Sequence, residues 1–123
     1  MFTRRMFFVL FFSISLIYSV SAAEFLEGFE DIPLMNGFKQ ITTQDFSFGN
    51  EETGYTETSI VANKNIKFDA VKTFYIDTMS ALGWHKEINT DKQLIFRREN
   101  DTLEITQTQK SPLKLLISLK SKN

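Results

Sequence analysis

Hydrophobic positions in the second half of the chain follow helical spacing between residues 68 and 82. One stripe collects the apolar and aromatic side chains, while Lys67, Lys72 and Asp77 fall largely away from it. Gly83 follows the last stripe residue and can adopt the left-handed conformation that ends a helix. The pattern therefore predicts an amphipathic helix over residues 68–82. Its stripe consists of Phe68, Val71, Phe74, Tyr75, Thr78, Met79 and Leu82.

Alternating apolar and polar positions predict strands on both sides of this helix. Upstream, Phe46 and Phe48 alternate with polar residues, and a polar turn leads to a stretch rich in Thr, Ile and Val. Downstream, turn residues separate four more alternating segments, which are 84–88, 93–98, 102–108 and 113–120. Strands with one apolar face form an antiparallel sheet that is covered on one side. Residues 43–123 are thus predicted to form a two-layer α+β domain. Its antiparallel sheet has about six strands, in the order ββαββββ, and a single helix covers one face.

Residues 23–42 precede this domain and are expected to form an extended N-terminal arm. Proline disfavours a continuing helix, and the Asn-Gly pair that follows favours a turn. The arm has two possible roles, since its apolar side chains either pack onto the domain's own core or dock on a partner. The residues available for partner binding are Phe29, Ile32, Leu34, Met35 and Phe38.

The first 22 residues have the pattern of a cleavable signal peptide. Arg4 and Arg5 are followed by an apolar stretch over residues 6–20, which is short for a membrane-spanning helix. Small residues then allow cleavage after Ala22, which we favour, or after Ala23. The protein is therefore expected in the periplasm or outside the cell. The alternative is an uncleaved leader, which would be the only membrane anchor of the predicted architecture.

The chain has no cysteine, and this narrows how an exported protein can be stabilised and anchored. Disulfide bonds are excluded, so stability must come from the core, to which the many phenylalanines beyond the leader can contribute. A lipid-modified N-terminus is excluded too, because it requires cysteine at the cleavage point.

Charge is distributed unevenly along a chain whose formal net charge is only −1. Acidic residues dominate between residues 24 and 57, and basic residues dominate from residue 64 onward. This is no nucleic-acid-binding signature; it indicates either two solvated faces or an oriented electrostatic contact. Lys86, Lys92, Arg97 and Arg98 are further candidates for a basic patch, which either keeps the sheet soluble or contacts anionic lipid headgroups or an acidic partner.

No arrangement of residues in the sequence indicates catalysis, a cofactor or a metal. His85 is the only histidine, and it lacks a cysteine or a second histidine to complete a metal site or a catalytic triad. Neither a phosphate-binding glycine loop nor a calcium-loop spacing occurs. We therefore predict no enzyme, and expect a periplasmic interaction or accessory module that docks on an envelope protein through its arm or a sheet edge. The alternative is a carrier of a small apolar ligand, held in a pocket between helix and sheet.

Two sequence features resemble a known group of proteins. Phe74-Tyr75 on the predicted helix is followed by Leu82-Gly83-Trp84 and a β-meander, and residues 29–37 precede them. Together they resemble an uncharacterised family of small exported proteins of alphaproteobacteria, including rickettsia-like bacteria. The resemblance implies an α+β envelope protein and assigns no catalytic residue.

Overall fold

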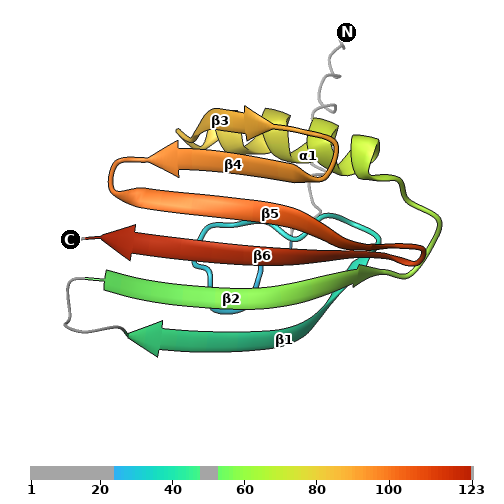
Figure 1. Cartoon of the computed structure of the whole chain (residues 1–123), viewed down its shortest axis with the longest axis horizontal. Coiled ribbons are helices and arrows are strands. Elements are labelled where there is room, and N and C mark those ends of the chain that lie inside the picture. The colour runs from blue at the N-terminus through green and yellow to red at the C-terminus, as the bar shows by residue number, and fades with distance from the viewer. Residues whose placement is uncertain (1–23, 48–52, 123) are drawn as a thin grey trace, which may run out of the picture.

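The computed structural model describes residues 24–47 and 53–122, which form one six-stranded sheet and one helix (Figure 1). The predicted leader and the turn after Phe48 lie outside the described residues. All neighbouring strands are antiparallel, and their order across the sheet is β1-β2-β6-β5-β4-β3. The predicted α+β class and the order ββαββββ are therefore confirmed. The elements are β1 Phe38–Ser47, β2 Thr53–Ala62, α1 Phe68–Ala81, β3 His85–Asn89, β4 Gln93–Arg98, β5 Asp101–Lys110 and β6 Leu113–Lys122.

The last strand of the chain lies in the middle of the sheet, between β2 and β5. It has the clearest alternation, and its Leu113, Leu115 and Ile117 side chains are buried on the face that carries the core. A strand with hydrogen-bonded neighbours on both sides and one fully apolar face is well suited to the centre of an open sheet.

Helix α1 ends where the sequence predicts, because Gly83 adopts a positive φ of 92°. The Trp84 N–H donates to the Met79 carbonyl at 2.9 Å, and the Gly83 N–H donates to the Ser80 carbonyl at 3.1 Å. The buried face is narrower than the predicted stripe, since it consists of Phe68, Val71, Tyr75 and Met79. Leu82, the last stripe residue, is exposed.

The helix covers only part of the apolar face of the sheet. In Figure 1, α1 runs behind β3 and β4, while residues 24–37 lie behind β5, β6 and β2. Leu26, Phe29 and Ile32 of this N-terminal segment are buried in the same core as the helix and the sheet. The covering layer thus has two parts, the helix that the sequence predicts and a second, non-helical part.

The N-terminal segment, residues 24–37, folds back on itself instead of running extended. Phe25 and Pro33 form an isolated antiparallel bridge, and the Leu26 N–H donates to the Ile32 carbonyl at 2.8 Å. The reversal between them uses positive φ values at Gly28 (89°) and Glu30 (53°). Backbone hydrogen bonds of this kind satisfy polar groups that lie next to a buried apolar surface.

Tyr75 of α1 ties the helix to the N-terminal segment. Its buried hydroxyl donates to the Pro33 carbonyl at 2.8 Å and accepts from the Met35 N–H at 3.3 Å. Phe74 packs edge-on against the Tyr75 ring, with 4.8 Å between ring centroids. A single phenol group therefore satisfies two backbone groups at the junction of the two covering parts.

Gln40 of β1 ties the other side of the N-terminal segment to the sheet. The Glu27 N–H donates to Gln40 Oε1 at 2.8 Å, and Gln40 Nε2 donates to the Glu27 carbonyl at 3.0 Å. Gln40 Nε2 also donates to Oγ1 of the buried Thr58, at 3.0 Å. The amide thus pairs with the segment's backbone much as a neighbouring strand would.

Replacing Tyr75 with phenylalanine should destabilise the protein by about 2 kcal/mol, because it leaves the Pro33 carbonyl and the Met35 N–H without their shared partner. Urea unfolding followed by circular dichroism measures this loss. Tyr55→Phe is the matched control, because Tyr55 lies half-exposed on the sheet and should cost less than about 1 kcal/mol. Equal losses in the two variants would show that the tie contributes nothing specific.

The stability of the wild type and that of the Tyr75→Phe variant should also respond differently to alkaline pH. Burial raises the pKa of the Tyr75 hydroxyl above its ordinary value of about 10. Above that pH the unfolded chain releases this proton while the folded chain keeps it, so stability is complete below pH 10 and falls as pH rises. The wild type should lose about 1.4 kcal/mol per pH unit more than Tyr75→Phe in this range. Parallel pH curves for the two proteins would contradict this assignment.

Candidate functional site

The five residues predicted for partner binding are mostly committed to the protein's own core. Phe29 and Ile32 have no exposed surface and Phe38 is buried, whereas Leu34 and Met35 are half-buried and pack against the core. This arrangement corresponds to the alternative in which the arm packs onto its own domain. Of the five, Leu34 and Met35 keep surface with which a partner can make contact in the folded state.

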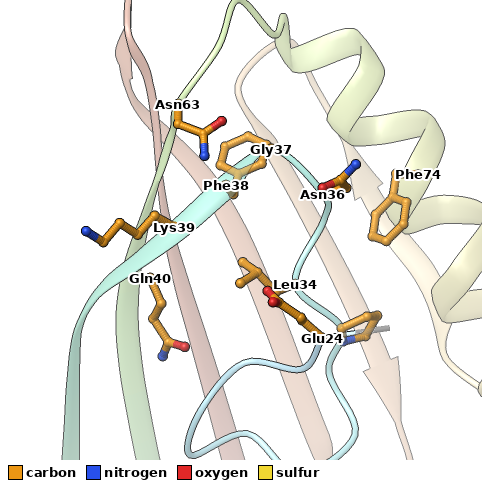
Figure 2. Close-up of a pocket in the computed structure, with 10 residues that line it drawn as sticks. Glu24, Leu34, Asn36, Gly37, Phe38, Lys39, Gln40, Asn63 and Phe74 are labelled. Carbon is orange, nitrogen blue, oxygen red and sulfur yellow. The ribbon is translucent and has the colours of Figure 1, made fainter. Parts of the chain in front are cut away.

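An open groove of about 870 Å³ lies beside the N-terminal segment (Figure 2). It extends from Phe74 of α1 to the beginning of β1. Leu34 and Glu24 of the N-terminal segment also line it. Figure 2 shows Asn36 next to Phe74 on one side of the groove, with Asn63 and Lys39 on the other. We call this surface the arm groove.

The arm groove combines apolar and polar walls. Leu34 and Phe74 are half-buried apolar residues, and Glu24 and Lys39 supply exposed charges of opposite sign. Asn36 and Asn63 are exposed, and each side-chain amide offers both hydrogen-bond donors and an acceptor. Such a lining can pair with the backbone of a peptide while its apolar walls bury a side chain.

Gly37, which lines the arm groove, lets the chain pass close to the loop after β2. Its φ is +98°, and a Cβ atom there would lie 2.7 Å from Ile66 Cδ1 and 2.8 Å from Lys64 Cε. The Asn63 N–H donates to the Gly37 carbonyl at 2.9 Å, which fixes the position of Asn63 relative to the N-terminal segment. Glycine is favoured here by both backbone conformation and space.

The predicted basic patch of Lys86, Lys92, Arg97 and Arg98 does not form as one surface. Arg97 pairs with Glu87 at 3.0 Å and Arg98 with Asp31 at 2.9 Å, so both arginines are neutralised locally. Lys92 precedes β4, whereas the arginines end that strand. The sequence shows these charges in proximity along the chain but not the acids that pair with them.

Arg98 instead joins the N-terminal segment to the end of α1. Its guanidinium donates to both carboxylate oxygens of Asp31, at 2.9 and 3.4 Å, and to the Leu82 carbonyl at 3.1 Å. It also lies 4.3 Å from the centre of the Trp84 ring. The hydrogen bonds that Arg98 donates to the Asp31 carboxylate raise the pKa of Arg98, so its charge is permanent. These contacts have a structural role, because they hold together three separate parts of the chain.

The described residues hold no group of three or more His, Cys, Asp or Glu side chains that could bind a metal ion. His85 is exposed at the start of β3, an edge strand whose residues are all exposed. Between α1 and the sheet, the buried side chains include Tyr75, Met79 and Phe96, where the carrier hypothesis requires a pocket.

Both edges of the sheet carry an irregularity. The register of β1 shifts between Gln40 and Thr42, and the register of β3 shifts between Lys86 and Ile88. Bulges on edge strands interrupt the regular row of backbone groups that another strand would pair with. Strand addition is therefore less favoured at these edges than docking in the arm groove.

Two residues of the site were not singled out from the sequence. Gln40 holds the N-terminal segment by hydrogen bonds and Asn63 lines the arm groove, but an isolated amide side chain does not form a recognisable pattern in a single sequence.

Comparison with protein-family models, curated proteins and solved structures finds no match to this chain. Among the residues that the structure describes, no helix has the length and hydropathy needed to cross a membrane.

Replacing Arg98 with lysine should destabilise the protein by about 1 kcal/mol. Lysine keeps the charge but loses the two-pronged contact with Asp31 and the stacking on Trp84. The expected loss is small because the Arg98 and Asp31 side chains are 28% and 46% exposed, so water screens the pair. Arg97→Lys is the control, since its more exposed pair with Glu87 should contribute less than about 0.5 kcal/mol. Thermal unfolding of both variants distinguishes the two, and a larger loss in the control would refute this role of Arg98.

Proposed function

We propose that this chain is exported and acts in the cell envelope as a non-enzymatic interaction module. Cleavage after Ala22 would release it into the periplasm or the medium. The sequence of the first 22 residues supports this proposal, because two arginines, an apolar stretch and small residues follow one another as in a cleavable signal peptide. Among the described residues, the buried side chain nearest to the predicted cut is Leu26, so cleavage after Ala22 would leave the described core intact.

The arm groove is the proposed docking site, and its proposed occupant is an extended segment of an envelope protein. One observation carries this choice: Leu34 and Phe74 keep apolar surface beside the exposed amides of Asn36 and Asn63. Apolar walls favour a side chain of the partner, and the amides can bond to its backbone. Glu24 and Lys39 would then orient the segment through their opposite charges.

Export can be tested by the mass of the protein recovered from exporting bacteria. We expect an N-terminus at Ala23, from cleavage after Ala22, or at Glu24, from cleavage after Ala23. Cleavage beyond Leu26 would remove a buried side chain and should yield an unfolded product. Recovery of the intact leader, or of the protein from the cytoplasm alone, would contradict the export proposal.

Docking can be tested with a photoreactive amino acid placed at Asn36 in living cells. It should crosslink to an envelope protein, and Asn63→Arg should reduce that crosslink about tenfold because a long charged side chain fills the arm groove. Asn89→Arg, on the exposed strand β3, should leave it unchanged. The same photoreactive group at Asn100 should give no such product, because Asn100 lies in the exposed turn between β4 and β5. Equal crosslinking at both positions, or no effect of Asn63→Arg, would rule out the arm groove as the docking site.

A further inference from the structure

Lysine side chains gather at one end of the sheet. At this end β2 stops, β1 and β6 begin, and the turns after β3 and β5 lie close to the start of α1 (Figure 1). We call this surface the lysine end. Its residues are Lys39, Lys64, Lys67, Lys92, Lys110 and Lys114.

The structure brings together lysines from distant parts of the sequence. A groove of about 540 Å³ has Lys64 on one wall and Lys110 on the other. A second groove, of about 450 Å³, is lined by Lys110 and Lys92. Lys39 and Lys114 both pair with Val61, from opposite sides of β2. The grooves therefore link Lys64, Lys110 and Lys92, the strand pairing links Lys39 and Lys114, and Lys67 precedes α1 at the same end.

Among the side chains of residues 24–41 and 54–122 these lysines make no ion pair, and the pairs are Arg97–Glu87 and Arg98–Asp31. Lys72, nearby on α1, donates to the Thr90 carbonyl at 3.2 Å and so also keeps its charge unneutralised. The acids at this end are Asp69 and Asp91, with Glu24 in the adjoining arm groove. A protein with a formal net charge of −1 thus has a strongly cationic end. Mutual repulsion among these lysines opposes folding, which an anionic partner would offset.

We infer that the lysine end binds the anionic headgroups of a membrane surface. A single phosphate or carboxylate is best bound by arginine, whose planar guanidinium group donates two parallel hydrogen bonds. Every basic residue of this surface is lysine instead. These lysines are exposed except for the half-buried Lys114, and they are spread over loops and strand ends. Ammonium groups distributed in this way suit a diffuse negative field, such as that of a lipid bilayer. The lysine end shares only Lys39 with the lining of the arm groove, and it adds a membrane contact beyond the leader.

Binding to lipid vesicles tests the inference with the processed protein recovered from exporting cells. Sedimentation with vesicles of phosphatidylcholine mixed with phosphatidylglycerol should carry the protein down, and vesicles of phosphatidylcholine alone should not. Raising the salt concentration should release it, because screening shortens the range of exposed charges. Equal binding to both kinds of vesicle, or none to either, would overturn the inference.

Two variants with the same change in net charge locate the binding surface. Lys64→Glu, Lys92→Glu and Lys110→Glu together should weaken binding about a hundredfold, given roughly fivefold per lysine near an anionic surface. Lys86→Glu, Lys120→Glu and Lys122→Glu together are the control, because these exposed lysines lie toward the opposite end of the sheet. The control should stay within about threefold of the wild type, and circular dichroism should show that both variants are folded.

Equal losses in the two variants would show that binding follows net charge alone, and would overturn the assignment to the lysine end. Competition with a soluble polyanion, heparin, gives the last outcome. Strong heparin binding without vesicle binding would mean that a flexible anionic polymer, and not a membrane, is the partner of this surface.

Discussion

The structure depends on how the apolar face of a broad sheet is kept from water. The apolar face of the six-stranded sheet is wider than one helix of 14 residues, and α1 lies behind only β3 and β4 (Figure 1). The N-terminal segment covers the rest by inserting Leu26, Phe29 and Ile32. Burying three large apolar side chains is worth several kcal/mol, which is a large share of the stability of a small domain without disulfide bonds.

The non-helical N-terminal segment needs hydrogen bonds from the side chains of other elements, because its backbone lacks the internal hydrogen bonds of a helix. Gln40, Tyr75 and Arg98 provide them from β1, α1 and β4, so three different elements each hold the N-terminal segment by one side chain. The arm groove is a consequence of this arrangement. It lies where the second part of the cover turns into β1, between Phe74 and Asn63.

Local sequence patterns predicted the elements well, because alternation and helical spacing are local properties. Gly83 marked the helix end, and the strand bounds agree to within about two residues except for β1, which begins at Phe38 among residues predicted to belong to the arm. The pairing of β2 with β6 is not a local property, and alternation alone cannot reveal it.

The N-terminal segment shows where single-sequence reasoning loses its basis. Phe29 and Ile32 were recognised as apolar, but an apolar residue that enters a core looks the same in sequence as one that meets a partner. Arg98 and Asp31 are 67 residues apart, so no local pattern indicates that they pair. The lysine end was missed for the same reason, because its members come from four separate loops and strand ends.

The central place of β6 has a consequence for the order in which the protein can fold. The hairpin of β1 and β2 meets its other neighbour only through a strand that begins at Leu113, so the sheet stays in two halves until almost the whole chain is available. Contacts between such distant segments form slowly, since a long loop must close first. For a chain that is exported, as we propose, the two halves of the sheet would stay apart until the end of the chain has been delivered, and the complete sheet would assemble after export.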